Sequence, residues 1–578
     1  MPAAPTCCVT FLRLHEQSDP LLTVMNWTTF EPLRRRTRVL LLVLALLSQG
    51  IQIYLFPAFA LDRVMQISSA QQLLRGRGLS TVSAAPEDLT RLRYERVVGW
   101  PPGYALMVAA FLALTKTLSW STALVDLAAA ALFFAAWCSI TKTCAGMATR
   151  GTWLALWAYW IVFGSPLAQL RASDAVALGL FFAALATALI AVGAPQHAVG
   201  LGLVSGLLMG LCCSVRFAYW PAILAIPVAL AGADMRGVKG LRRIALSHVL
   251  VGMSALFAVA LYQRWATGHA TYLSSYYASE RASFSIAVLG KMAPFPLSSL
   301  GSEGTWRRAL ARLELPSAAV EWTVWVLAAA IMWIYLVDLM QDLVPWKSAM
   351  SSNVPFGSAH IVYHLTGMAV GTLFLGMVCY LSVRTALATW RQGGWTYVEE
   401  VRYLAATFPF FALAMMRCAL VRRATLIARY SRLTACCVLA LAIAVMGFSR
   451  ARLMSRSVTD LTSSPAHQLD QAARILRSMG PETNTPIFFV DEWTRSVGMM
   501  AGLPVLPART LLSGTVSSSV PVRAILVLPN RSQPGDPGRA GAGGSDAIRS
   551  FVSAHHLKVL ASTYDADYFL VSLGASGE

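Results

Sequence analysis

Apolar runs of about 17–22 residues recur along most of the chain, and short polar loops separate them. Runs of this length with few charged residues are typical of transmembrane helices, because each can satisfy its backbone hydrogen bonds internally within lipid. The pattern therefore predicts an α-helical polytopic membrane protein. The runs begin near residues 38, 102, 120, 152, 175, 198, 217, 244, 320, 361, 401 and 433.

The basic loops decide how many of these runs cross the membrane. "RRRTR" precedes the first run, so residues 1–37 are predicted to be a cytoplasmic tail. If the run after "PPGY" lies along the surface as a juxtamembrane helix, "RGVKGLRR" and "VRRATLIARYSR" both fall on the cytoplasmic side. This choice predicts about eleven spans within residues 38–450. It leaves two loops, 61–119 and 263–319, on the outer side.

The pattern changes after residue 450. "TPIFFVD", "VRAILVLP" and "LKVLASTY" have the composition of buried strands, whereas "HQLDQAARILRSMG" and "DAIRSFVSAHH" have helical periodicity. Alternation of strands and helices predicts a small α/β domain. Residues 451–578 are therefore predicted to form an extracytoplasmic C-terminal domain.

Composition narrows the class of protein. Of the 578 residues 56% are hydrophobic and 13% are charged, and the formal net charge is +19. The basic residues gather in short loops between apolar runs, which excludes a nucleic-acid-binding module. Most of the 10 cysteines lie inside apolar runs without the spacing of a metal or redox site, and they are interpreted as packing residues.

The predicted topology brings five polar segments to the outer membrane surface. Charged groups there have two interpretations that stay open. Arginines reach lipid headgroups and acids cap helices, or the groups form a site. The five segments are Asp62, "RASD" from Arg171 to Asp174, Arg216, Arg264 and "EEVRY" from Glu399 to Tyr403.

The residue types in these segments suit transfer from a lipid phosphate. Asp62 and Asp174 each open a helical pattern, so each is either an N-cap or a group that could accept a proton from a hydroxyl nucleophile. Either acid could instead help to hold a divalent metal ion. The arginines suit phosphate, because a guanidinium is always charged and can bind two oxygens at once.

Several pieces of the chain, in order over residues 38–420, carry a resemblance to a known family. The sequence resembles the dolichyl-phosphate-mannose protein mannosyltransferases and their bacterial relatives that transfer aminoarabinose to lipid A, all within the GT-C superfamily. Two positions depart from the family pattern: Arg63 stands where a Glu is usual, and Gly99-Trp100 where some relatives have Glu-Lys. The pieces are "LDRVMQISSAQQLLRGRGLS", "GWPPGYALMVAAFLAL", "RASDAVALGLFFAALATAL", "GLVSGLLMGLCCSVRFAYWPAILAIP" and "EEVRYLAATFPFFALA".

The resemblance implies an inverting glycosyltransferase that uses a polyprenyl-phosphate monosaccharide on the extracytoplasmic side of the membrane. It assigns catalysis to Asp62 and Asp174, which would also be the ligands of any metal ion. It also assigns Arg216 and Arg402 to the donor phosphate. Arg171 and Arg264, which the predicted topology places at the same surface, are expected to bind the donor phosphate as well, and Tyr104 and Tyr403 are expected to contact substrate.

Three further expectations complete this interpretation. The chain is expected in a bacterial plasma (inner) membrane, with a polyprenyl-phosphate-linked sugar, the lipid bilayer and an acceptor as partners, and with no nucleic acid. Two rival functions stay open, a lipid or solute transporter and a non-catalytic GT-C-like protein of envelope assembly. A transporter would place its charges in mid-span, whereas a non-catalytic relative would not depend on Asp62.

Overall fold

The computed structural model describes most of the chain between residues 61 and 574. Apart from isolated positions, the described ranges are 61–145, 172–235, 240–271, 295–300, 303–343, 356–390, 401–420, 426–459, 487–490, 502–529, 542–562 and 566–574.

Within the described ranges, seven segments are long and apolar enough to cross a membrane, which confirms the predicted membrane protein. The count of about eleven stays a prediction, because the runs near residues 38 and 152 lie outside the described residues. The helices in these seven segments are α4 (Leu118–Ala145), α7 (Ser173–Gly193), α8 (Ala198–Val215), α9 (Ala225–Met235, with the turns before it), α10 (Leu241–Thr267), α14 (Ser317–Leu343) and α16 (Phe356–Trp390). A further long helix is α18 (Leu426–Thr459).

Shorter helices complete the bundle. Helix α3 (Gly103–Thr115) starts directly after Pro101 and Pro102. Its 13 residues would span about 20 Å at 1.5 Å per residue, less than the hydrocarbon core. This length agrees with the juxtamembrane helix expected there. The other short helices are α13 (Glu303–Ala311) and α17 (Phe408–Leu420), with 3₁₀ turns η4 (Pro195–His197), η5 (Phe217–Tyr219), η6 (Pro221–Leu224), η7 (Phe295–Leu300) and η8 (Val401–Thr407).

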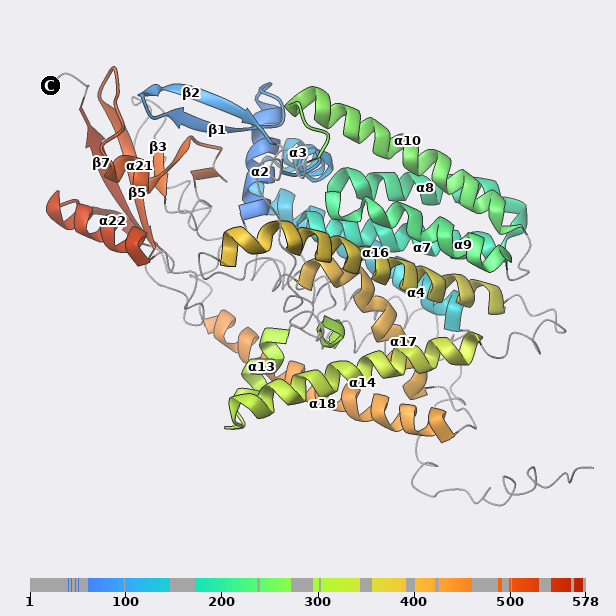
Figure 1. Cartoon of the computed structure of the whole chain (residues 1–578). Coiled ribbons are helices and arrows are strands. Elements are labelled where there is room, and N and C mark those ends of the chain that lie inside the picture. Colours follow the sequence, from blue (N-terminus) through green and yellow to red (C-terminus); the bar gives the residue numbers. More distant parts are fainter. Residues whose placement is uncertain are drawn as a thin grey trace, which may run out of the picture.

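The helices form two groups. In Figure 1, α4, α7, α8, α9, α10 and α16 lie side by side, whereas α13, α14 and α18 form a second group below them, and α17 lies between the groups. A continuous apolar core joins both groups, from Phe181 and Phe182 on α7 to Phe410 and Phe411 on α17.

Helices α8 and α10 pack closely because α8 presents a row of glycines. A Cβ added to Gly206 would lie 2.4 Å from the carbonyl oxygen of His248, and one added to Gly210 would lie 2.3 Å from the Cβ of Ala255. Small residues at every fourth position let two helix backbones approach, as is common within membranes. This packing fixes the end of α8, which carries Arg216.

The C-terminal domain is built on a five-stranded sheet in the order β4-β3-β5-β7-β6. Strand β3 (Ile487–Val490) pairs in parallel with β4 (Val505–Pro507) and β5 (Val522–Pro529), while β7 (Ala566–Leu573) is antiparallel to β5 and β6 (Val559–Ser562). The predicted strands in "TPIFFVD", "VRAILVLP" and "LKVLASTY" are confirmed, as is a helix over "DAIRSFVSA" within α22 (Ala542–Ala554). The sequence pattern missed β4, β7 and α21 (Ala508–Leu512), and the helix expected over 467–480 lies outside the described residues.

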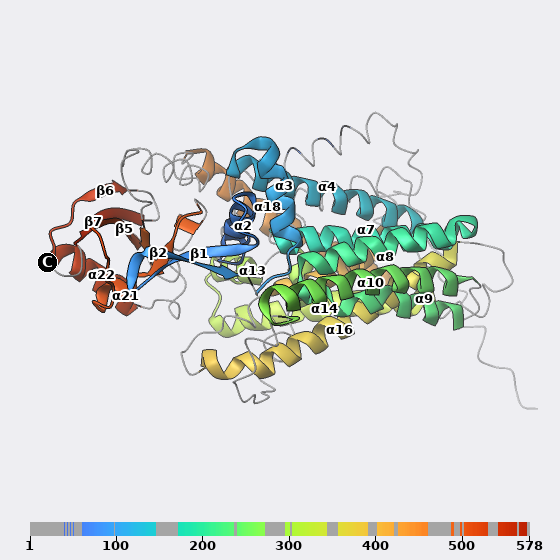
Figure 2. The same cartoon turned by 90° about the horizontal axis from the view of Figure 1, so that it is seen from above.

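A β-hairpin that the sequence analysis did not predict connects the bundle to this domain. It follows α2 (Leu61–Leu74) and consists of β1 (Ser80–Ala85) and β2 (Asp88–Arg96). The hairpin extends from the bundle to the five-stranded sheet (Figures 1 and 2). Ala84 and Leu89 near its turn belong to the same apolar core as Ile487 and Phe489.

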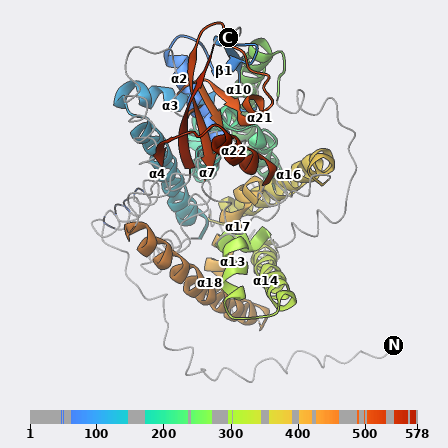
Figure 3. The same ribbon diagram turned by 90° about the vertical axis from the view of Figure 1, so that its left-hand side faces the viewer.

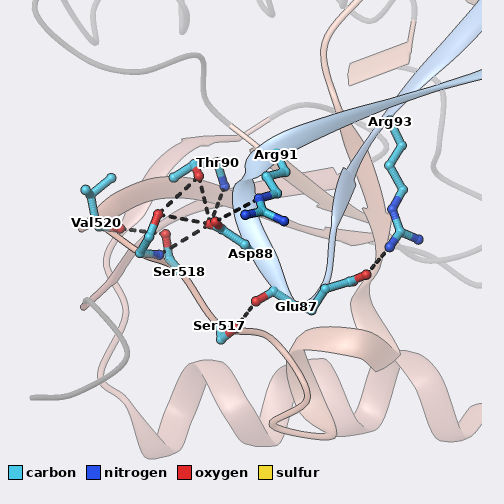
Figure 4. Close-up of polar contacts among 9 residues, drawn as sticks. Glu87, Asp88, Thr90, Arg91, Arg93, Ser517, Ser518 and Val520 are labelled. Atoms are coloured by element: carbon cyan, nitrogen blue, oxygen red, sulfur yellow. Dashed lines mark hydrogen bonds and ion pairs between the residues drawn. The ribbon is translucent and has the colours of Figure 1, made fainter.

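Polar contacts fix the tip of the hairpin to the domain (Figure 4). The backbone of Ser517 donates to the carbonyl of Pro86 (2.9 Å) and accepts from the amide of Leu89 (3.0 Å). The Asp88 carboxylate accepts bonds from Thr90 and from the amide and hydroxyl of Ser519. The hairpin tip therefore forms part of the C-terminal domain.

Helix α2 also contacts the domain directly. The carbonyl of Gly502 accepts from Gln72 Nε2 (3.2 Å) and from an Arg75 guanidinium nitrogen (2.8 Å). Viewed from its own end, the domain lies over the part of the bundle that contains α2 and α7, and α14 and α18 lie to one side (Figure 3). The last turn of α2 is thus fixed to the domain, and its first turn enters the candidate site.

Candidate functional site

An ion pair joins two of the predicted site segments. Asp174 lies in the first turn of α7, and Arg216 follows the last residue of α8 in an extended conformation. Arg216 Nε lies 2.8 Å from Asp174 Oδ1, and the side chains are only 5% and 12% exposed. The structure therefore brings together Asp174 and Arg216, two of the predicted site residues.

A second buried ion pair lies at the start of α2. An Arg63 guanidinium nitrogen is 2.8 Å from Asp126 Oδ2 on α4, and the two side chains are 2% and 3% exposed. Tyr104 on α3 is completely buried and lies close enough to interact electrostatically with both charges. Burial raises the pKa of the Tyr104 phenol, so this group stays neutral at physiological pH.

The two ion pairs meet at the backbone that opens α7. The amide of Ala172 donates to Asp126 Oδ1 (3.3 Å), and Gln66 Nε2 on α2 donates to Ser173 Oγ (3.3 Å). Ala172 has φ +60° and ψ −136°, a conformation that L-residues rarely adopt and that costs about 1–3 kcal/mol. Backbone strain of this kind is found at functional sites and persists where the surroundings hold it.

A cleft opens next to this cluster, with an empty volume of about 320 Å³ that is partly open to solvent. Gln66 lines it and so connects it to the ion pairs. At its rim, an Arg96 guanidinium nitrogen donates to the carbonyl of Ala266 (3.0 Å) and the guanidinium lies over the ring of Trp265. The other lining residues include Ser69, Trp100, Pro102, Tyr262 and Gln263.

Four of the predicted site side chains lie outside the described part of the structure. Asp62 falls in the first turn of α2 beside Arg63, but only its backbone is described. The same holds for Arg402 and Tyr403 in η8, which packs against α7 and α16. Arg171 is not described at all. The roles expected of these four residues stay predictions.

The remaining two predicted residues are placed differently from each other. Arg264 lies in the last turn of α10 and is exposed beside the cleft residue Gln263. Tyr104 has no exposed surface and lies against the Arg63–Asp126 pair, so its substrate contact also stays a prediction.

The described residues do not favour a metal ion bound through Asp174. Among them, no three His, Cys, Asp or Glu side chains come together as a metal-binding group. Asp174 Oδ1 already faces the Arg216 guanidinium at 2.8 Å, and a positive charge so close opposes a cation. Asp174 is therefore suited to holding an arginine.

Sequence reasoning missed the roles of Arg63, Gln66 and Asp126. A signal was available for Asp126, because it is the one acidic residue within the apolar helix Leu118–Ala145. Ionisable residues inside apolar helices are rare and are usually paired or functional. Arg63 was visible as a departure from the family pattern, but its partner lies 63 positions away.

Comparisons with known proteins give structural neighbours only. Comparison of the sequence with protein-family models and with curated proteins finds no match. The structure is similar to ArnT from Cupriavidus metallidurans bound to undecaprenyl phosphate, with 14% identity, coverage of 92% of this chain and 97% of that chain, and a TM-score of 0.43. It is also similar to the oligosaccharyltransferase AglB from Archaeoglobus fulgidus in complex with an inhibitory peptide and a dolichol-phosphate, with 12% identity, coverage of 85% and 69%, and a TM-score of 0.41.

Proposed function

We propose that this protein is a membrane glycosyltransferase that moves a sugar from a polyprenyl-phosphate monosaccharide to a hydroxyl or amine acceptor at the extracytoplasmic membrane face. One observation carries the proposal. The sequence pieces that resemble the mannosyltransferase and aminoarabinose transferase family are distant in the chain, yet those around Asp62, Asp174 and Arg216 meet at one end of the bundle.

The chemistry is a single displacement at the anomeric carbon of the sugar. The acceptor oxygen or nitrogen forms a bond to this carbon while the bond from the carbon to the phosphate oxygen breaks. Asp62 takes the acceptor proton, and the bonding electrons leave with the polyprenyl phosphate. The sugar configuration inverts, and no step is assigned to a metal ion.

Charge on the departing phosphate needs nearby cations. Arg216 forms an ion pair with Asp174, so the two side chains together carry little net charge. Arg216 is therefore expected to contribute mainly by donating N–H hydrogen bonds in a fixed direction. Arg264 is exposed in the last turn of α10, and we assign to it, together with Arg171 and Arg402, the larger share of phosphate stabilisation.

The cleft beside Gln66 suits a sugar. Its lining combines the aromatic rings of Trp100 and Tyr262 with the polar groups of Ser69 and Gln263, and aromatic faces with a few directed hydrogen-bonding groups are suited to binding sugar rings. The cleft is therefore the place where we expect the transferred sugar or the acceptor to bind.

The test uses purified protein in lipid with a panel of polyprenyl-phosphate monosaccharides and membrane extract as acceptor. Release of polyprenyl phosphate is followed for wild type, for Asp62→Asn and for the matched control Asp546→Asn on the exposed face of α22. We expect release by wild type and the control, and a loss of about 10²–10⁴-fold in Asp62→Asn.

Two results contradict the proposal in different ways. Equal release by Asp62→Asn would make Asp62 a helix cap and move the site elsewhere. Binding of donors by wild type without any consumption would favour a non-catalytic relative, and movement of the intact donor across the bilayer would favour a transporter.

A further inference from the structure

The carboxylate of Asp126 joins two helices that carry the predicted catalytic acids. One of its oxygens accepts from Arg63 on α2 at 2.8 Å, and the other accepts from the Ala172 amide before α7 at 3.3 Å. Arg63 directly follows Asp62, and Ala172 precedes Asp174 by two positions. Asp126 itself belongs to α4, so one side chain connects three separate helices.

We propose that Asp126 is a positioning residue that sets the separation between the first turn of α2 and the first turn of α7, and so between Asp62 and Asp174. Its effect on turnover rests on the proposed glycosyltransferase function, but the structural coupling itself does not. Asp126 is not placed in contact with substrate, and it acts through Arg63 and the Ala172 amide.

Stability alone does not explain a buried charge pair at this position. Several neighbours of Asp126 on α4 are apolar and buried, among them Val125, Ala129 and Ala130. Replacing a buried ion pair by apolar residues of similar volume is often neutral or stabilising, because burial removes both charges from water. What the ion pair adds, and an apolar contact lacks, is a fixed direction and distance.

The backbone of Ala172 is a second, independent observation. Its positive φ of 60° is unfavourable for a residue with a Cβ, so surrounding contacts must hold it. Asp126 Oδ1 accepts from the amide of this very residue. The strained turn decides where Ser173 and Asp174 begin α7, and the same carboxylate that holds it also holds α2.

The experiment compares Asp126→Asn, Arg63→Met and the double variant Arg63→Met/Asp126→Asn with wild type. The single variants each leave one buried charge without its partner, so both are expected to lower the Tm. The double variant has no unpaired charge, so its Tm is expected to return close to the wild-type value. The neutral Asn oxygen is a weaker acceptor for the Ala172 amide than a carboxylate, so the hold on α7 is loosened. Removal of the exposed Arg549–Asp546 pair on α22 is the matched control.

Turnover separates positioning from stability. We expect kcat of the double variant to stay about 10²-fold below wild type with an unchanged KM, because a displacement of about 1 Å between catalytic groups can cost that factor. Recovery of kcat together with Tm would show that the pair is merely structural and would overturn the proposal.

Amide hydrogen exchange tests the coupling without any substrate. We expect the double variant to exchange faster than wild type both in α2 and in residues 172–180, while exchange in the middle of α10 is unchanged. Unchanged exchange in both segments overturns the proposal, even if wild type is an active transferase. If no donor is consumed by wild type, the proposed function fails but faster exchange still supports the positioning role.

Discussion

Two buried charge clusters occupy different parts of the bundle, and they are organised differently. The first consists of the pairs Arg63–Asp126 and Asp174–Arg216, near the C-terminal domain. The second joins α14, α16 and α17 near the end of α14 and the start of α16. In it, an Arg417 guanidinium nitrogen lies 3.0 Å from Asp338 Oδ2 and 3.1 Å from His364 Nε2, and it also contacts His360.

The comparison shows that burial of charge does not by itself identify a site. The Arg417 cluster gathers around one guanidinium, and its side chains, like those of the first cluster, are largely shielded from solvent. The first cluster is divided into two pairs, with a strained backbone and a cleft beside them. We infer that the Arg417 cluster holds three helices together, whereas the first cluster orients groups toward a substrate.

The largest effect is expected from Arg417→Met. This change removes the guanidinium from the buried carboxylate of Asp338, which costs about 3–5 kcal/mol of folding stability. The Tm in detergent or lipid is therefore expected to fall strongly, while kcat of the protein that remains folded is expected to change little.

The exposed Arg429 on α18 provides the matched control, since Arg429→Met is expected to change stability by less than about 0.5 kcal/mol. The double variant Asp338→Asn/Arg417→Met is expected to recover most of the lost Tm. A normal Tm with lost turnover in Arg417→Met would instead make this cluster part of the site.

For Arg216→Met we expect the opposite, a small loss of stability and a large loss of turnover. Asp174 keeps a 12% exposed side chain, so water can partly solvate it once the guanidinium is gone. A stability loss of about 1–3 kcal/mol follows from the unpaired group, together with a loss of turnover of at least about 10²-fold. The exposed Arg243 on α10 gives the control substitution Arg243→Met, which is expected to leave both quantities unchanged.

The Tm and donor turnover of Arg216→Met and Arg417→Met, measured side by side, test the difference between the clusters directly. If the two variants lose Tm and turnover in the same ratio, both clusters are structural and the distinction drawn above is wrong.

Local patterns in the sequence were sufficient for the membrane helices and for most of the C-terminal strands. Period and length specify each apolar helix, and a run such as "IFFV" specifies a buried strand wherever it packs. The hairpin was missed because "DLTRLRYER" carries several charges and is exposed over most of its length. Its stability comes from contacts with Ser517 and Ser519, more than 400 positions away.

In the candidate site, too, some residues could be identified from the sequence and others could not. Asp174 and Arg216 could be found from sequence because the predicted positive-inside topology places the start of α7 and the end of α8 on one face. The pairing of Arg63 with Asp126 could not, because it depends on the rotation of α2 and α4 about their axes. Sequence pattern indicates which face of a helix is apolar, but a single charge within an apolar face has no periodicity to locate its partner.

A smaller effect is expected from Ala172→Gly. Glycine adopts positive φ without the steric cost that Ala172 bears, so the substitution removes strain from the folded state. Two effects oppose this gain in stability: the methyl group is lost, and the unfolded chain becomes more flexible. Stability is expected to stay level or to rise by up to about 1 kcal/mol. Ala188→Gly, at a fully buried position within α7, is the matched control and is expected to lower stability by about 1–2 kcal/mol.

Thermal unfolding of the two variants is the measurement, and we expect the Tm of Ala172→Gly to stay level or rise and that of Ala188→Gly to fall. A loss of Tm in Ala172→Gly as large as that in Ala188→Gly would show that the turn before Asp174 bears no strain, and the first cluster would then lose one of the features that set it apart.

The smallest effect concerns the hairpin that ties α2 to the C-terminal domain. Hydrogen bonds from Thr90, and further bonds from Ser519, lower the pKa of the Asp88 carboxyl below its usual value. A lowered pKa means that the charged form is favoured in the folded protein. The contact therefore stabilises the hairpin above about pH 4, and this contribution is lost as the pH falls through the lowered pKa.

Hydrogen exchange of residues 80–96, corrected for the pH dependence of the intrinsic rate, is the measurement. Between about pH 5 and pH 8 we expect constant protection, with a decrease only below about pH 4, and Asp88→Asn is expected to remove this decrease. The same decrease in Asp88→Asn would assign it to another acid. Asp88 is near the surface, so its effect is expected to be much smaller than that of Arg216 or Arg417, whose charges are shielded from water.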